Sequence, residues 1–453
     1  MVLTGAQVPT LVGTPAGRVV AFRHNEFGNG NGKTWTQIPV QVDQRKVVGF
    51  GDYPATNAEP GVTGTVYGST STGITALQYA DPATFVGADP NAALDADDEV
   101  VFMVSDAGGE LAPDETSEPA GVVHRSGVAV EIDDPRGEAE TGWVYLFAST
   151  GGLQPAAGQD YVDYDFTLTS GAYKATYKRA DGPNPETSKV TTAAYEIGFT
   201  DRWKEDSWRV QAGDASGVDI LDGHKVQFAI FSCGRSNETF ADGEGAFVAN
   251  IDGPVRAIRS YVGANSGPLT QRTHLMYRDR VDVVSDLRVH NIPFVMDFYD
   301  YSAAATGMLY GSSTTRGGVA IDGRADAVSK AVPTWEAITG PQGQVLTRAT
   351  LVTDLTDAGG VDASTEWFYR DQTNPPEEQC WGDGSLLGAN GPFYNVAIPN
   401  TDPRETPFAT VQARRTTQFE APADDPRTIP AAADEWSADL ATPLTATASP
   451  YRP

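Results

Sequence analysis

Positive charge is scarce in this sequence. Of its 453 residues, 32 are Lys or Arg and 60 are Asp or Glu, which gives a formal net charge of −28. Binding of nucleic acid requires Lys and Arg to displace counterions from phosphates, so we expect no nucleic-acid partner. Only eight of the basic residues are lysines. An acidic, lysine-poor surface is typical of proteins in salty or extracellular water, and a GC-rich genome would produce the same bias.

Cysteine is almost absent. Cys233 and Cys380 are the two cysteines, and neither lies in a CxxC or Cys/His pattern, so no zinc or redox motif is indicated. A bridge between them would close a long loop and stabilise the fold by about 4–5 kcal/mol. Two separate thiols are equally compatible with the sequence.

Long hydrophobic runs are also lacking. No apolar stretch reaches the roughly 18 residues of a membrane-spanning helix, so we expect no membrane span. The first residues, MVLTGAQVPTLVG, have no basic region or long apolar core of a signal peptide. We expect an extracellular or cell-surface protein. If it is secreted, either the signal has already been removed from this numbering or the first Met was added.

Helical periodicity is nearly missing, and alternation of apolar and polar residues takes its place. Residues 128–133 alternate, whereas 99–104 and 143–148 are continuous apolar runs typical of central strands. Short helical turns are expected near 325–331 and 433–440. These patterns predict an all-β protein, built as a large antiparallel β-sandwich with little helix.

The length suggests two or three domains at about 150 residues each. We expect an N-terminal β region over residues 1–120, a main β-sandwich over 121–419 and a Pro-rich extended tail over 420–453. The composition of the tail predicts extended chain, held against its own domain or a neighbouring subunit. Within the sandwich, alternation on both sides of a Ser-Gly turn predicts a β-hairpin over 163–178.

The segment 271–301 has the highest density of groups that transfer protons or bind anions. Arginine can neutralise the carboxylate of a uronic acid and so ease removal of the neighbouring C–H proton, while Tyr or His acts as base and acid. The alternative is a set of Arg–Asp pairs along a solvated strand, with histidines hydrogen-bonded in loops. The candidate catalytic residues are His274, Tyr277, Arg278, Arg280, Arg288 and His290.

Tryptophans beside acidic residues suggest a sugar-binding surface. Trp335 and Trp367 could stack on sugar rings while Asp297 and Asp300 bind hydroxyl groups. The two aspartates are also a candidate carboxylate pair for glycoside hydrolysis. The alternative is that the tryptophans belong to the core or rim of a large sandwich.

A cluster of carboxylates suggests a metal site. Asp95, Asp97, Asp98 and Glu99 immediately precede or begin an apolar strand. Oxygen-rich turns of this kind suit Ca²⁺, which is the candidate cofactor, although the pattern is not an EF-hand. The alternative is an acidic turn that caps the strand.

One segment resembles a known family. NIDGPVRAIRSYVGANSG, with the strands that follow it, is similar to galactose-mutarotase-like β-supersandwich proteins over about residues 250–323. Gly253, Pro254, Val255 and Arg256 form the GPVR motif of that likeness. The segments WTQIPVQVDQR and LDADDEVVFMVSDAGG are similar to N-terminal strands of such domains. The resemblance implies a supersandwich fold and a carbohydrate ligand, as in sugar epimerases and polysaccharide lyases.

Three functions are compatible with these features. The first is an exported carbohydrate-active lyase or hydrolase that acts on an acidic polysaccharide. The second is a non-catalytic extracellular surface or filament subunit that self-associates through its extended termini. The third is a calcium-dependent carbohydrate-binding adhesin. The sequence contains no GxSxG, HExxH or P-loop motif in a fitting context that would decide the reaction.

Overall fold

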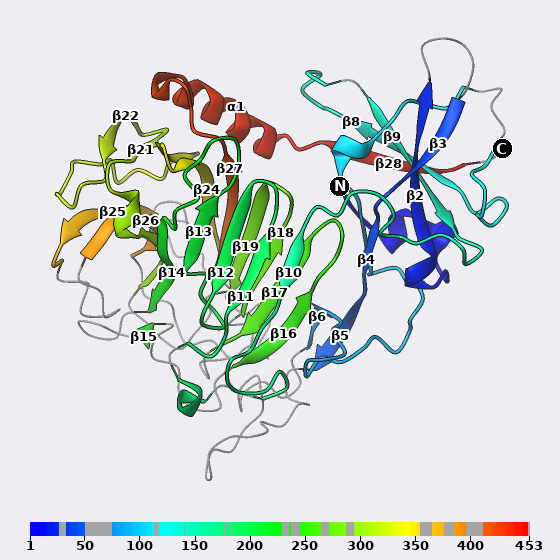
Figure 1. Ribbon diagram of the computed structural model, residues 1–453, viewed down its shortest axis with the longest axis horizontal. Helices are drawn as coiled ribbons and strands as arrows, with labels where there is room; N and C mark the ends of the chain where they lie inside the picture. Colours follow the sequence, from blue (N-terminus) through cyan, green and yellow to red (C-terminus); the bar gives the residue numbers. More distant parts are fainter. Residues whose placement is uncertain are drawn as a thin grey trace.

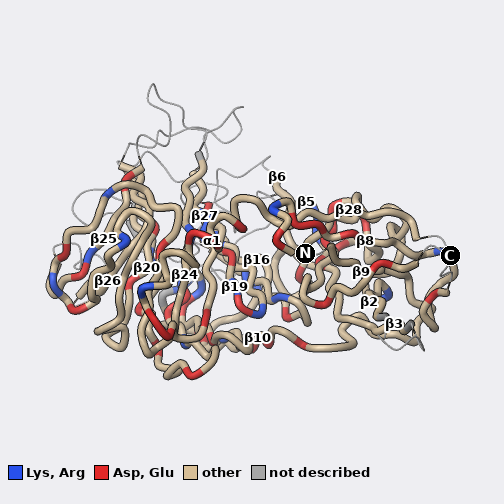
Figure 2. The backbone as a smooth tube through the Cα atoms, turned by 90° about the horizontal axis from the view of Figure 1, so that it is seen from above, with Lys and Arg blue, Asp and Glu red and all other residues tan. Residues whose placement is uncertain are grey.

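The computed structural model describes residues 1–26, 33–49, 75–112, 117–139, 141–175, 178–182, 184–228, 235–236, 245–263, 271–286, 294–353, 365–375, 385–395 and 411–451. Figure 1 shows a large sandwich beside a smaller part, the N-terminal part, which contains the first strands and the last one. In the described residues every sheet is antiparallel, so the all-β prediction is confirmed. Acidic residues are spread over both parts (Figure 2).

The N-terminal part is built from three small sheets. The three-stranded sheet has the order β1-β7-β4, the five-stranded sheet β28-β8-β9-β2-β3, and the third sheet pairs β5 with β6. As predicted, the continuous apolar runs form central strands, because β7 and β9 each have a neighbour on both sides. The strands are β1 (Val2–Thr4), β2 (Val19–Glu26), β3 (Lys33–Ile38), β4 (Gln41–Asp43), β5 (Arg45–Gly49), β6 (Thr75–Tyr79), β7 (Glu99–Val101), β8 (Val128–Asp133), β9 (Gly142–Ala148) and β28 (Thr445–Pro450).

One layer of the sandwich, the nine-stranded layer, has the order β16-β17-β18-β19-β27-β24-β23-β21-β22. Its strands are β16 (Ala246–Ile251), β17 (Ala257–Val262), β18 (Gln271–Met276), β19 (Arg280–Asp286), β21 (Leu309–Ser312), β22 (Thr315–Ala320), β23 (Glu336–Gly340), β24 (Gly343–Thr353) and β27 (Val411–Glu420).

The opposite layer consists of a four-stranded sheet, β10-β11-β12-β13, and a five-stranded sheet, β15-β14-β20-β26-β25. The two sheets continue into one another, because the backbone N–H of Ile220 donates to the carbonyl of Trp208 at 2.9 Å. The strands are β10 (Asp163–Asp165), β11 (Ser188–Thr191), β12 (Tyr195–Phe199), β13 (Ser207–Val210), β14 (Leu221–Phe228), β15 (Arg235–Ser236), β20 (Val295–Tyr301), β25 (Thr365–Thr373) and β26 (Ser385–Tyr394).

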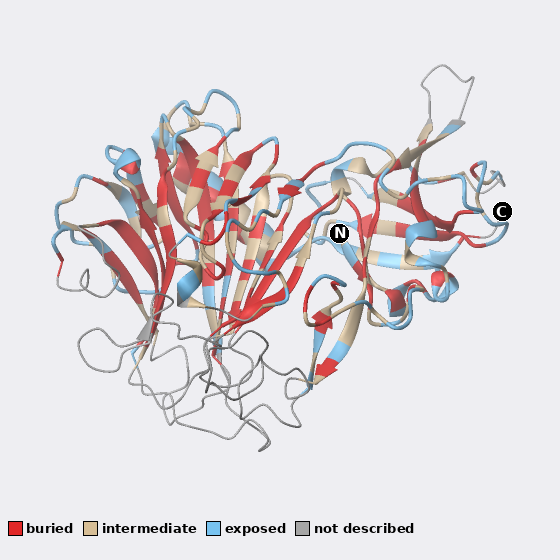
Figure 3. Ribbon diagram, turned by 60° about the horizontal axis from the view of Figure 1, so that its bottom comes forward, coloured by how far each residue is buried: buried red, intermediate tan, exposed pale blue. Residues whose placement is uncertain are grey.

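The main core lies between the two layers. Trp208 of the opposite layer packs edge-to-face against Phe419 of the nine-stranded layer, with ring centroids 5.3 Å apart, and against Tyr299 at 4.4 Å. Figure 3 shows buried residues along the strands of both layers. Burial of large aromatic side chains of this kind contributes most of the driving force for folding.

Short 3-10 turns connect several of these strands. They are η1 (Gly5–Gln7), η2 (Pro9–Leu11), η3 (Ala16–Arg18), η4 (Val104–Asp106), η5 (Arg179–Asp181), η7 (Ala303–Ala305) and η10 (Pro426–Thr428). In the described part of the chain, no helix combines the length and the apolar composition needed to cross a bilayer.

The sequence predicted an extended tail, but the structure shows that the tail is extended only in part. Residues 429–441 form helix α1 (Ile429–Ala441), which covers the turn expected near 433–440, whereas 325–331 is not helical. Alanine is the strongest helix former. A proline is tolerated in the first turn because the backbone N–H groups there have no partner within the helix. Ile429 and Ala433 of α1 pack on Trp335 and Leu346 of the sandwich.

The predicted boundary at residue 120 is not where the sheets divide. β8 and β9 lie within the range assigned to the main sandwich, but they pair with each other and with β2 and β28 of the N-terminal part. The predicted hairpin over 163–178 does not form either, because β10 pairs with β11. Alternation identifies strands, but long-range packing chooses their partners.

The GPVR motif lies at the junction of the two parts. The Oε1 atom of Gln41 in β4 accepts the backbone N–H groups of Val255, at 3.2 Å, and Arg256, at 3.1 Å. Gly253 leaves room for this side chain, since a Cβ atom there would lie 2.3 Å from the Gln41 Oε1 atom. The motif therefore has a structural role at this junction.

Arg256 completes the junction as a buried cation. Its Nε–H donates to Asp43 Oδ2 at 2.9 Å, and its guanidinium also binds Glu99. One buried cation of the sandwich therefore meets two carboxylates of the N-terminal part here. Burial works against ionisation, but Asp43 and the other partners hold the pKa of Arg256 well above its ordinary value.

Candidate functional site

The predicted catalytic residues do not converge on one surface. His274 in β18 points into the sandwich and is 1% exposed. Tyr277 lies at the junction, where its hydroxyl oxygen accepts an N–H group of Arg256 at 3.0 Å. Arg288 and His290 lie outside the described residues.

The two remaining arginines are surface residues. Arg278 binds Asp279 at 2.9 Å and Arg280 binds Asp282 at 2.9 Å, and all four side chains are partly exposed. This arrangement matches the alternative of Arg–Asp pairs along a solvated strand. Such pairs contribute little to stability.

The predicted sugar-stacking tryptophans are core residues. Trp335 is 1% and Trp367 is 3% exposed. The indole N–H of Trp335 donates to Asp434 Oδ1 of α1 at 2.7 Å, and that of Trp367 donates to Glu336 Oε1 at 2.8 Å. Neither ring face is open to a ligand from solvent.

Asp300 is likewise part of the interior. Its Oδ2 atom accepts from Lys225 Nζ at 2.8 Å, and its Oδ1 atom accepts the backbone N–H of Leu387 at 2.9 Å. Burial raises the pKa of Asp300 to about 7. Asp300 therefore serves to hold β14, β20 and β26 together.

The acidic segment at the start of β7 has several protein partners. Asp98 accepts the backbone N–H groups of Arg45, at 2.8 Å, and Asp95, at 2.9 Å. Glu99 binds Arg45 at 2.8 Å and also Arg256. Asp95 and Asp97 lie next to one another, and the hydrogen bond between them raises the pKa of Asp97. Calcium binding by these two carboxylates stays a prediction.

A buried network of charged groups crosses the sandwich and centres on Asp297 of β20. Its carboxylate binds Arg272 of β18 at 2.8 Å and Arg415 of β27 at 2.9 Å. His224 of β14 is its third partner, with Nε2 at 2.8 Å from Oδ1. Burial alone would raise the pKa of Asp297, but these three groups hold it well below its ordinary range. The network therefore contains an ionised carboxylate in the protein interior.

Glu205, between β12 and β13, extends the network. Its Oε1 atom lies 3.2 Å from His224 Nδ1, and its Oε2 atom accepts the indole N–H of Trp208 at 3.2 Å. Burial opposes ionisation, but His224 and the neighbouring polar groups lower the pKa of Glu205 to about 2. Sequence reasoning missed both Glu205 and His224. The available signal was the position of Glu205 between Trp203 and Trp208, which are both buried.

His274 lies beside these two residues. Burial lowers the pKa of His274 to about 3, so the imidazole is neutral at physiological pH. Neither of its ring nitrogens has a hydrogen-bond partner, although the side chain is buried. Its ring meets Phe199 edge-on, with centroids 5.2 Å apart. Buried polar atoms without partners are uncommon in folded proteins.

A polar groove of about 480 Å³ lies on the outer side of the same loop. Residues 204 and 206 line it, whereas Glu205 between them points inward. The groove is lined by Asn184, Thr200, Asp201, Lys204, Asp206, Ser207, Arg209, Asp219 and Asp222. Every lining residue is polar, and the lining contains both donors and acceptors.

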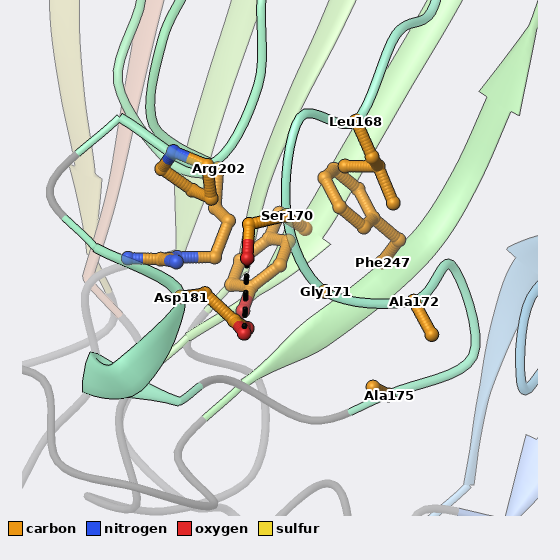
Figure 4. Close-up of a pocket in the computed structure, with 10 residues that line it drawn as sticks. Leu168, Ser170, Gly171, Ala172, Ala175, Asp181, Arg202 and Phe247 are labelled. Carbon is orange, nitrogen blue, oxygen red and sulfur yellow. Dashed lines mark hydrogen bonds between the residues drawn. The ribbon is translucent and has the colours of Figure 1, made fainter.

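A second pocket is much smaller. It leaves about 30 Å³ between the loop around Gly171 and the ring of Phe247. Figure 4 shows Ser170 and Asp181 joined by a hydrogen bond of 3.5 Å at its edge, with Arg202 beside them. This space suits about one water molecule rather than an organic ligand.

Among the comparisons with known proteins, solved structures give a distant likeness. No family model matches the chain, and no curated protein matches it. Among solved structures, a protein from Escherichia coli K12 described as a "Putative aldose 1-epimerase" is similar at 12% identity with a TM-score of 0.28. The match covers 51% of this chain and 97% of that one.

Proposed function

We propose that the protein binds a carbohydrate in the polar groove beside β12, β13 and β14. The observation that carries this proposal is the lining of the groove, which consists entirely of hydrogen-bonding side chains. A sugar presents hydroxyl groups that donate and accept, so it needs both kinds of partner. Lys204 and Arg209 donate, the aspartates accept, and Asn184, Thr200 and Ser207 do both.

The size and rigidity of the groove support this proposal. Small-molecule sites occupy about 300–1,000 Å³, and 480 Å³ lies within that range. Asp219 is fixed by the backbone N–H groups of Trp208, at 2.9 Å, and Leu221, at 3.3 Å. Asp206 accepts the backbone N–H of Thr200 at 3.2 Å and also its hydroxyl group. Side chains held in place in this way lose little entropy when a ligand binds.

The charge of the groove bears on the class of sugar. Four aspartates and two basic residues line it. A uronic-acid polymer would meet an excess of negative charge, so a neutral sugar fits better than the acidic polysaccharide predicted from the sequence. Hydrolysis of such a ligand and an extracellular location are further parts of the proposal. A lyase would instead require a ligand with the carboxylate of a uronic acid.

A glycan array followed by calorimetry with the full chain tests the proposal. Arg209→Ala removes a groove donor, and Arg280→Ala is a matched control because both side chains are 41% exposed and paired with an acid. We expect at least tenfold weaker sugar binding for Arg209→Ala and unchanged binding for Arg280→Ala. Equal binding by the two variants, or no binding across neutral and acidic glycans, contradicts the proposal.

A second candidate function, self-association, is favoured by the position of β28. This strand forms six residue pairs with β8, and exposed residues 442–444 connect it to α1. The same pairs could form between two copies of the chain by exchange of the strand. Light scattering over a range of protein concentrations tests this. A monomer at all concentrations, with and without residues 442–451, contradicts it.

A further inference from the structure

We propose that Glu205, His224 and His274 bind a divalent transition-metal ion of the zinc type inside the sandwich. One donor atom from each lies within 4.8 Å of the other two, and the three side chains are 0–1% exposed. They come from the β12–β13 connection, β14 and β18, so the ion would join both layers. This inference does not depend on the carbohydrate groove.

The spacing of two donors agrees with a metal site as well as with a long hydrogen bond. His224 Nε2 lies 2.8 Å from Asp297 Oδ1, which is the length of a charge-assisted hydrogen bond. On the other side of the same ring, Nδ1 lies 3.2 Å from Glu205 Oε1, which is long for such a bond in a dry interior. Two ligands at about 2.0–2.1 Å from one tetrahedral zinc ion are separated by about 3.3 Å.

His274 supplies the third donor and an independent observation. Both of its ring nitrogens lack a hydrogen-bond partner, although the residue is 1% exposed. A buried imidazole in this state is unusual unless it binds something. A bound ion would occupy the lone pair of one nitrogen and remove the anomaly.

The surrounding residues orient these ligands as in known metal centres. Histidine ligands usually donate their second N–H to a carboxylate, which fixes the tautomer. Asp297 has this position beside His224, and Arg272 and Arg415 hold it there. The second oxygen of Glu205 is held by the indole N–H of Trp208 at 3.2 Å.

The donor set selects the class of ion. Two imidazole nitrogens and one carboxylate oxygen suit Zn²⁺ and related first-row ions, whereas Ca²⁺ and Mg²⁺ prefer an all-oxygen shell. The ion would also place a positive charge beside Glu205, whose ion-pair partner is a histidine rather than Arg272 or Arg415.

The other cluster of this kind among the described residues does not qualify. Glu138, Glu435 and Asp439 are exposed and surround Arg136. The guanidinium group already provides the positive charge at the centre of these three carboxylates.

Metal content measured on the full chain tests the proposal. After equilibration with Zn²⁺ and removal of unbound ions, we expect one zinc per chain in the unmodified protein and in His124→Gln, whose imidazole is exposed. Glu205→Gln and His274→Gln should bind Zn²⁺ at least tenfold more weakly. Unchanged affinity in both variants, or the absence of equimolar zinc in the unmodified protein, overturns the proposal.

A second measurement covers the case in which these variants do not fold. X-ray absorption of the zinc-loaded, unmodified protein reports the ligands directly. A first shell of oxygen and nitrogen atoms with two imidazole rings supports the site. A shell that contains sulfur, from Cys233 or Cys380, or a shell with no imidazole, overturns it.

Discussion

Arg259 and Glu186 form two parallel hydrogen bonds, of 2.9 and 2.5 Å, in the interior of the sandwich. Both residues are 0% exposed. Arg259 belongs to β17 of the nine-stranded layer, and Glu186 lies just before β11 of the opposite layer. The pair therefore connects the two layers where the core offers no water to replace either partner.

Removal of one partner should be costly. Glu186→Ala leaves the guanidinium of Arg259 buried without its carboxylate, and we expect a loss of about 3–5 kcal/mol in the free energy of unfolding, measured by chemical denaturation. Glu366→Ala, which breaks a partly exposed pair with Lys330, should lose at most about 1 kcal/mol. A loss as small for Glu186→Ala as for the control contradicts this prediction.

Glu336 should make the stability depend on pH. Its carboxyl is buried and accepts hydrogen bonds from Tyr310, at 2.7 Å, and Trp367, at 2.8 Å, and burial raises the pKa of Glu336 from 4.5 to about 7. Between these pH values the folded state holds a proton that the unfolded state has released. The contribution of Glu336 to stability is therefore complete below about pH 4.5 and is lost as the pH rises to about 7.

The variant Glu336→Gln removes this dependence. At pH 8 we expect it to be more stable than the unmodified protein by up to about 3 kcal/mol, and at pH 4 the difference should vanish. Denaturation at both pH values measures this, with Glu366→Gln on the partly exposed end of β25 as the control. A pH-independent difference between Glu336→Gln and the unmodified protein contradicts the prediction.

Gly253→Ala should weaken the junction between the two parts. The added Cβ atom would lie 2.3–2.6 Å from the amide group of Gln41, which must then leave the backbone N–H groups that it binds. We expect a loss of about 1–3 kcal/mol and faster proteolysis between the two parts. Gly17→Ala is the control, since no atom lies within 4 Å of the added Cβ there. Equal proteolysis of both variants would argue against this role of Gly253.

Calcium binding by Asp95 and Asp97 predicts a higher melting temperature with Ca²⁺ than with EDTA. The increase should disappear in Asp95→Asn and Asp97→Asn, and Mg²⁺ at the same concentration should have a smaller effect. If Ca²⁺ does not change the melting temperature, the prediction is wrong and this segment is an acidic turn that starts β7.

The fold class followed from the sequence because alternation directly records which residues share a face of a strand. The tail shows where composition misleads. Its prolines suggested extended chain, but Pro430 occupies the first turn of α1 and the alanines that follow favour a helix. The partners of the strands could not be predicted from the sequence either, because β8 pairs with β28 some 300 residues later.

The site was only half predictable. His274 and Asp297 stood out by residue type, but the same argument placed them on a solvated surface. Arg272 and His274 lie on the face of β18 that turns toward the opposite layer. The buried face of this strand therefore carries polar side chains, contrary to the usual pattern. Glu205 and His224 come from other strands, and only the register between the layers brings them to His274. Alternation within one strand contains no information about that register.

The pairing of β28 with β8 sets an order of events during translation. Until residue 450 has left the ribosome, the outer edge of β8 has no neighbouring strand, although residues 1–148 have long been available to fold. An open edge of this kind is a template for intermolecular pairing. Nascent and prematurely terminated chains would therefore carry an adhesive edge, and we expect them to be the species that chaperones must shield.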